Sequence, residues 1–287
     1  MKVVVHIPAL NPAEYGAQLT QRLAAIFPSG LEPHSGWFGI RLPLDDPRCS
    51  DVLQGLEQAG LKPWESRNRP IKRGVEFSVN YIRTYDDADL DACTYLQLLP
   101  DTRLESVLPK TVEEAKSRNL VHIALADIDP SFDFMLVDRC HAVVPRRVRM
   151  LLDGAGLIGL AWRPIVLWDS HKRSNRRIEA EAFDDLIGER ILPPVSPTVE
   201  LYDSRTKQRV APGHPDPVRL QEGLYTPVEP HYRAADLEAF GPFDVARTFE
   251  RPWGGDHNRH IIVSSRFYRF CREHRLRTGF VPVRIEE

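Results

Sequence analysis

The amino-acid sequence predicts an α+β fold in which short helices pack on antiparallel or mixed sheets. Residues 75–83 alternate apolar with polar side chains, as a half-buried antiparallel strand does. A short amphipathic helix followed by a Leu-led apolar strand occurs twice, and more loosely a third time at residues 50–64. The chain has 24 prolines among its 287 residues, about 8%, which is above the usual ~5%. This proline content favours many short elements joined by stiff loops.

The composition is that of an ordinary globular protein. The chain has 287 residues, of which 42% are apolar and 27% charged, enough for one large or two modest cores. A formal net charge of −2 gives no overall field that would attract nucleic acid or an anionic membrane. No apolar run approaches the roughly 20 residues of a spanning helix, and the N-terminal apolar run is too short for a signal peptide. We therefore expect a cytoplasmic protein without membrane association.

The cysteines are scattered, at Cys49, Cys93, Cys140 and Cys271. None of them forms a pair at the two-residue spacing of a zinc knuckle or a redox motif, so we expect free and mostly buried thiols. No cofactor is expected, because the sequence has neither a phosphate-binding glycine loop with its lysine nor a dinucleotide fingerprint.

Residues 1–110 are expected to form an N-terminal α+β portion. Strands are predicted from apolar runs and alternation at residues 3–7, 37–42 and 75–83. Helices are predicted to begin at Asn11, which precedes a proline at the first helical position, and to span residues 50–60. The turn-rich stretch at residues 100–110 breaks the periodic pattern and is the expected border.

Residues 111–287 are expected to hold two related sheet-and-helix units, at about residues 120–170 and 198–287. The connection between them is basic at residues 171–177 and rich in proline at residues 193–197. This composition is typical of exposed loops, so we expect the connection to lie at the surface.

The repeat brings two arginines into register. The first passage begins at Val144 and the second at Val263, an offset of 119 residues, which places Arg147 and Arg266 at equivalent positions in the first turn of each helix. A cation gains nothing from the helix dipole there. Two interpretations stay open: each arginine forms a structural salt bridge with a nearby acidic side chain, or the two belong to a paired contact surface for a partner.

The second passage resembles a known family. The run Val263-Ser-Ser-Arg-Phe267, followed by Leu276-Arg-Thr-Gly-Phe280 and a strand containing proline, looks like the C-terminal end of immunity proteins from bacterial polymorphic-toxin systems. Residues 232–244 and 134–160 are similar to segments of the subgroup named for two CxxCG motifs. The resemblance covers about residues 134–168 and 225–287. This chain contains no CxxCG, so we expect the structural zinc of that subgroup to be absent.

The resemblance implies a protein that binds and neutralises a cognate protein toxin stoichiometrically and has no catalytic residues. Such a binder needs a stiff surface whose charge matches that of its partner. Aromatic and arginine side chains dominate binding hot spots. Those in the irregular segments are the candidate anchors: Trp168, Arg173, Arg176, Arg177, Tyr232 and Trp253. Alternatively, Trp168 is a core residue and the arginines belong to a solvated loop.

A metal-dependent hydrolase is one alternative. It would use the segment from Asp256 to His260, in which His257 and His260 could share a metal on a helical turn. Two preceding glycines favour a surface loop, and the spacing identifies no third ligand. A second acidic set, which includes Asp133, lacks the glycine and the closing glutamate of a calcium loop.

A nucleic-acid-binding protein is the other alternative. It would use the basic segment at residues 171–177. This segment lacks the interleaved aromatic side chains on which bases stack, and the chain as a whole is slightly acidic.

Overall fold

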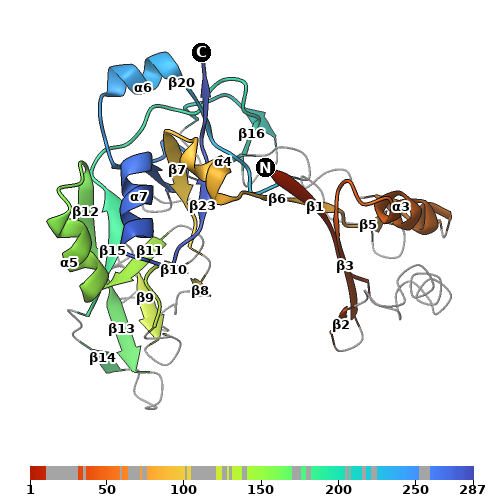
Figure 1. Cartoon of the computed structure of the whole chain (residues 1–287), viewed down its shortest axis with the longest axis horizontal. Coiled ribbons are helices and arrows are strands. Elements are labelled where there is room, and N and C mark those ends of the chain that lie inside the picture. Colours follow the sequence, from red (N-terminus) through yellow and green to blue (C-terminus); the bar gives the residue numbers. More distant parts are fainter. Residues whose placement is uncertain are drawn as a thin grey trace. The chain divides into compact units, whose positions relative to one another are not determined.

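The computed structural model describes residues 1–10, 32–34, 37–58, 60–63, 72, 76–100, 102–104, 121–124, 128, 131–137, 141–169, 176–178, 182–203, 206, 208–214, 218–220, 225–251 and 259–287. Short helices and several sheets, in which most strand pairs are antiparallel, confirm the predicted α+β fold (Figure 1). The chain forms two compact units, Met1–Asp89 with Gln221–Val228, and Leu90–Leu220 with Glu229–Glu287.

The first unit is built on a five-stranded sheet in the order β19-β6-β1-β3-β2. Its strands are β1 (Lys2–Leu10), β2 (Glu32–His34), β3 (Trp37–Pro43), β6 (Asn80–Thr84) and β19 (Tyr225–Thr226). Helix α3 (Arg48–Gln58) buries Val52 and Leu56 in one core with Val5 and Ile7 of β1. The short strands β4 (Lys62–Pro63) and β5 (Glu76–Phe77) pair in parallel, and α4 (Asp87–Asp91) follows β6.

Two predictions for this unit need comment. The single strand expected at residues 75–83 forms two strands, because β5 ends at Phe77 and β6 begins at Asn80. Phe77 at the end of β5 and Val79 within the break are both buried. The helix expected to begin at Asn11 lies outside the described residues.

The second unit contains the two repeated passages, each next to its own sheet. The first sheet has the order β12-β15-β11-β10-β8 and the second has the order β21-β22-β7-β23. The strands of the first sheet are β8 (Thr102–Leu104), β10 (Met135–Val137), β11 (His141–Pro145), β12 (Leu160–Pro164) and β15 (Phe183–Gly188). Those of the second are β7 (Tyr95–Leu98), β21 (Val245–Arg247), β22 (Ile261–Ser264) and β23 (Phe280–Pro282).

Smaller elements complete this unit. Three-stranded sheets are formed by β9 (His122–Ala124), β13 (Val166–Asp169) and β14 (Arg176–Ile178), and by β16 (Leu201–Asp203), β17 (Arg209–Val210) and β18 (Val218–Leu220). Strand β20 (His231–Arg233) pairs in parallel with β24 (Arg284–Glu286), and α6 (Ala234–Phe240) follows β20 directly.

Each repeated passage forms a strand, a helix and a second strand. Strand β11 leads into α5 (Arg146–Gly154) and β12, and β22 leads into α7 (Ser265–Glu273) and β23. Val148 of α5 and Phe267 of α7 are fully buried in the same core. After α5 the backbone of Gly156 has a φ of 60°, and Arg275, at the equivalent place after α7, has a φ of 55°. The turn thus keeps its left-handed conformation without the glycine, at a cost of ~1 kcal/mol.

Two expectations about the domain borders differ from the structure. The first unit ends at Asp89 and not within residues 100–110, because β7 lies between β22 and β23 of the second unit. Residues 221–228 return to the first unit, where β19 pairs with β6. Both differences come from strand pairs that are distant in sequence, which local composition does not reveal.

The connection between the repeated passages is less exposed than expected. Strand β15 lies inside the first sheet, between β12 and β11. In the proline-rich stretch, Val195 and Ser196 are buried, because their backbone N–H groups donate to the carboxylate of Glu250 and to the carbonyl of His231. The expectation of an exposed connection was therefore wrong for Val195 and Ser196, whereas Pro197 is exposed.

Gly188 is expected to be essential where β15 meets the backbone of β21. A Cβ at this position would lie 2.6 Å from the carbonyl carbon of Ala246, and backbone cannot move aside as a flexible side chain does. We expect Gly188→Ala to lower the free energy of unfolding by about 2–3 kcal/mol. Gly154→Ala is the matched control, since a Cβ in α5 would meet nothing within 4 Å, and it should raise stability by about 0.5–1 kcal/mol. Urea unfolding measures both, and equal effects of the two substitutions would contradict the close approach.

Candidate functional site

Arg147 and Arg266 each form an ion pair with a buried aspartate. Nη1 of Arg147 lies 2.5 Å from Oδ1 of Asp133, and Nη1 of Arg266 lies 2.9 Å from Oδ2 of Asp244. Both aspartates are buried, while both arginine side chains are about half exposed. The interpretation of each arginine as part of a structural salt bridge is therefore confirmed. The exposed half of each guanidinium leaves the second interpretation open as well.

The two aspartates also link the helices to each other. Oδ2 of Asp133 accepts the backbone N–H of Arg277, in the turn after α7, at 2.7 Å. Oδ2 of Asp244 accepts the backbone N–H of Ile158, in the turn after α5, at 2.9 Å. Arg266 in turn donates to the carbonyls of Ala155 and Gly156 at the end of α5. The beginning of each helix is thus tied to the turn at the end of the other.

The outward side of this helix pair exposes large apolar side chains. Met150 is 65% exposed, Leu151 40% and Ile158 49%. Among the seven exposed large hydrophobic residues in the described chain, these three fall within nine consecutive positions of α5 and the turn after it. Met150 and Leu151 contribute nothing to the core that holds the rest of α5. Exposed apolar side chains that gather in one region are a feature of protein contact surfaces.

The corresponding side of α7 is basic. Arg269 occupies the position equivalent to Met150, and Arg275 and Arg277 follow in the turn after the helix, all three exposed. None of these three side chains has an acidic partner among the residues that the structure describes. We call the surface made by Arg147, Met150, Leu151, Ile158, Arg266, Arg269, Arg275 and Arg277 the two-helix face. It combines an apolar patch with arginines, two features that are enriched at protein interfaces.

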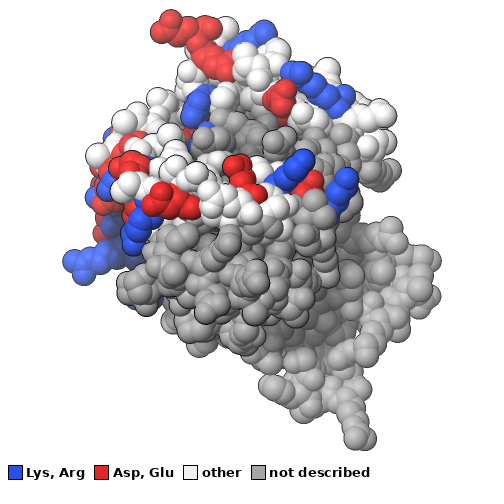
Figure 2. Space-filling view, turned by 90° about the vertical axis from the view of Figure 1, so that its right-hand side faces the viewer, with Lys and Arg blue, Asp and Glu red and all other residues white. Residues whose placement is uncertain are grey.

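Positively and negatively charged side chains are mixed over the side of the molecule that Figure 2 shows. Figure 2 shows Lys and Arg side chains interspersed with Asp and Glu side chains over the described atoms of one side of the molecule. A mixed distribution of this kind produces no extended field of one sign. It agrees with the net charge of −2 and leaves local surfaces as the sites where a partner would be recognised.

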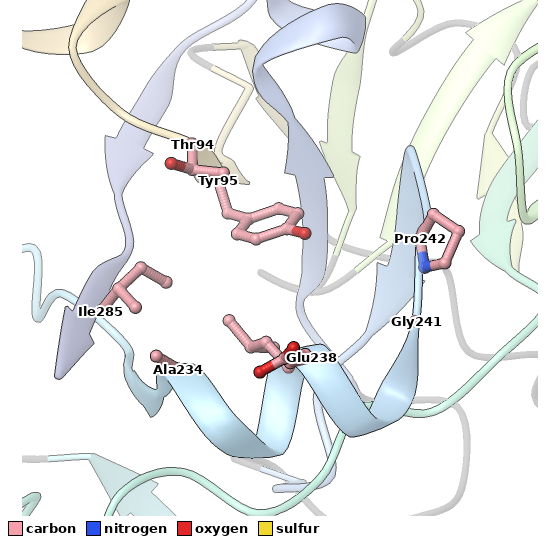
Figure 3. A pocket seen from close by; sticks show the side chains of 8 residues that line it. Thr94, Tyr95, Ala234, Glu238, Gly241, Pro242 and Ile285 are labelled. Atoms are coloured by element: carbon pink, nitrogen blue, oxygen red, sulfur yellow. The ribbon is translucent and has the colours of Figure 1, made fainter. Parts of the chain in front are cut away.

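A groove of about 350 Å³ lies beside α6 in the second unit (Figure 3). Its lining comes from α6, from the start of β7 and from β24: Thr94, Tyr95, Ala234, Leu237, Glu238, Gly241, Pro242 and Ile285. The ring of Tyr95 stacks on Phe243 with 4.6 Å between the centroids, and burial raises the pKa of its hydroxyl. The groove is therefore firm on its sheet side and mostly apolar.

A polar network inside the first sheet was not anticipated from the sequence. Oδ2 of the fully buried Asp185 lies 3.2 Å from Nδ1 of His141 and accepts a hydrogen bond from Nε of Arg163 at 3.1 Å. Nη2 of Arg163 also lies 2.9 Å from that histidine nitrogen. A His–Asp pair is typical of general-base sites, but here the guanidinium of Arg163 contacts both members of the pair. The network joins β11, β12 and β15, and we interpret it as structural.

The candidate metal loop is described at one end alone. Asp256 and His257 lie outside the described residues, and His260 precedes β22. Within the described chain, no three histidine, cysteine or acidic side chains are grouped as metal ligands would be. Asp133, from the second acidic set, is engaged by Arg147 and by the backbone of Arg277.

His260 should make stability depend on pH. Burial of its ring lowers its pKa from 6.5 to about 4. The native protein then holds the ring neutral while the unfolded chain protonates it, so stability is fully present above pH 6.5 and falls as the pH drops toward 4. We expect a loss of about 2 kcal/mol between pH 6.5 and pH 5. Urea unfolding at both pH values should show a smaller loss for His260→Gln, and an equal loss in the two proteins would contradict the assignment.

The candidate anchors have different positions. Tyr232 is fully buried in the core beside α6 and β20, so the expectation that it is an exposed anchor was wrong. Trp168 lies in β13 and pairs with Arg177 of the neighbouring β14, which also contains Arg176. The side chains of these three residues are outside the described part, as are Arg173 and Trp253 altogether.

The three cysteines that the structure describes, Cys49, Cys93 and Cys271, are free thiols as expected, and Cys140 is not described.

The sequence pattern did not single out Met150, Leu151 or Ile158 as exposed residues, because apolar side chains at helical spacing are expected to face the core. No helix in the described part of the chain is long and apolar enough to cross a membrane.

No protein-family model matches this chain, and no curated protein matches it.

Proposed function

We propose that this chain is an immunity protein, which binds a cognate bacterial toxin stoichiometrically in the cytoplasm and thereby neutralises it. The observation that carries the proposal is the two-helix face, which combines exposed apolar side chains of α5 and the turn after it with Arg269, Arg275 and Arg277, three arginines that have no acidic partner within the described residues. The resemblance of the two repeated passages to immunity proteins supports the same function, because α5 and α7 are the helices of those passages.

The construction of the two-helix face suits a binder that must be stiff. Buried carboxylates hold Arg147 and Arg266 in fixed positions, and the same carboxylates hold the turns that follow α7 and α5. Side chains that are already ordered lose less conformational entropy when a partner binds. A surface organised in this way gains affinity without any reactive group.

The charge of the two-helix face indicates the charge of the toxin surface. Arg269, Arg275 and Arg277 would attract an acidic surface and repel a basic one, which speeds correct encounters and disfavours wrong partners. Met150 and Leu151, which are exposed on α5, would be desolvated at the centre of the contact. The toxin should therefore present an apolar surface patch that is bordered by acidic residues.

A genetic experiment tests the proposal. Deletion of this gene beside an intact neighbouring toxin gene should stop growth, and expression of the wild-type chain in trans should restore it. An inactivated toxin gene is the control, because deletion should then be harmless. Normal growth after deletion, with the active toxin shown to be produced, would overturn the proposed function.

A further inference from the structure

The groove beside α6 has apolar walls and a single charged lining residue. Leu237, Pro242 and Ile285 form the apolar sides with the ring of Tyr95, and Glu238 supplies the charge. In Figure 3 the phenol of Tyr95 and the carboxylate of Glu238 lie around the same opening. Apolar walls with one charge at the mouth fit a ligand that has an aliphatic stem and a charged head.

The sign of that head follows from the charges around the groove. Glu238 is exposed, and its carboxylate has no hydrogen-bond or ion-pair partner within the part of the chain that the structure describes. The nearby Arg190 is already engaged, since its guanidinium lies 3.7 Å from the ring centroid of Phe240 and donates to the carbonyls of Phe240 and Pro242. The groove therefore favours a cation from outside.

The groove is also close to the two-helix face. Pro242 in its lining is two residues before Asp244, whose carboxylate holds the backbone of Ile158 in the two-helix face. The backbone N–H of Asp244 donates to the carbonyl of Ile158 at 2.8 Å. A protein bound to the two-helix face could thus extend a side chain past Ile158 into the groove.

We infer that the groove binds the side chain of a lysine or arginine of the toxin. The aliphatic stem would lie along Leu237 and Tyr95, and the cationic head would donate to the carboxylate of Glu238. The identity of the partner rests on the proposed function, whereas the chemistry of the groove does not. The groove would add a basic contact beside the acidic surface that the two-helix face attracts.

Peptide binding monitored by NMR tests the inference without the toxin. The probes are N-acetyl-Ala-Lys-Ala-amide and the same peptide with norleucine, which keeps the stem and removes the charge. The lysine peptide should shift the backbone amide signals of Tyr95, Glu238 and Gly241 in a saturable manner. Its affinity should fall at least about fivefold in Glu238→Gln, the size of a charged hydrogen bond at a partly exposed site. Glu273→Gln, an exposed glutamate on α7 outside the groove, should leave the affinity unchanged.

Three outcomes would overturn the inference. These are equal binding of the norleucine peptide, unchanged affinity in Glu238→Gln, and spermidine binding more than about tenfold tighter than the lysine peptide, which would identify a polyamine site. The experiment is independent of the growth test. Failure of the peptide to bind therefore leaves the immunity function standing, and failure of the growth test leaves the groove chemistry standing.

Discussion

Replacement of both Met150 and Leu151 by aspartate is expected to abolish toxin neutralisation without unfolding the protein. Each residue is well exposed and outside the core, so the free energy of unfolding should change little. Burial of one such anchor contributes roughly 1.5–3 kcal/mol to binding, and the new carboxylates would face an acidic partner. The dissociation constant should therefore rise by at least about 100-fold. Titration calorimetry with the C-terminal domain of the neighbouring toxin measures it.

Leu44→Asp provides the matched control for this prediction. Leu44 is 45% exposed, similar to Leu151, but belongs to the first unit. It should leave both binding and rescue of growth unaltered. If Leu44→Asp weakens binding as much as the double substitution does, the apolar patch on α5 has no special role.

Asp244→Ala is expected to have the largest effect on stability. Its carboxylate accepts hydrogen bonds from the hydroxyl of Ser264 at 2.6 Å, from Arg266 at 2.9 Å and from the backbone of Ile158 at 2.9 Å. Removal leaves these donors without their acceptor and releases the turn after α5. Loss of one partner of a buried ion pair lowers the free energy of unfolding by about 3–5 kcal/mol. Because the side chain of Arg266 is half exposed, we expect a loss at the lower end of this range. Urea unfolding measures the loss.

Asp91→Ala separates burial from charge pairing. Asp91 and Arg272 form an ion pair at the same 2.9 Å, but both side chains are about half exposed. Exposed pairs of this kind contribute about 0.2–1 kcal/mol, so this variant should unfold nearly as the wild type does. Equal losses for Asp91→Ala and Asp244→Ala would show that the buried aspartate does not organise the helix pair.

The helix pair was predictable in part. The periodic apolar residues placed α5 and α7 correctly, because Val148 and Phe267 recur at the same offset and both are buried. Their aspartate partners were harder to find. Asp133 is 14 residues before Arg147, whereas Asp244 is 22 residues before Arg266, so a search at constant offset misses the pair. The Phe-Asp dipeptide that precedes each passage was the available signal.

Other features depend on the tertiary structure and have no local signal. The three residues His141, Arg163 and Asp185 meet because β11, β15 and β12 are neighbours in one sheet, although they are distant in sequence. Tyr232 looked like an exposed anchor in an irregular segment, but β20 pairs with the C-terminal β24 and carries it into the interior. Strand pairing between distant segments decided both outcomes, and a single sequence does not display it.

Hydrogen–deuterium exchange on the complex with the neighbouring toxin tests the central claim most directly. The two-helix face as the contact surface predicts slower exchange at residues 146–158 and 265–277 in the complex than in the free protein. Strands β1 and β3 of the first unit should exchange at unchanged rates. Unchanged exchange across both helices, together with protection elsewhere on the chain, would contradict the account.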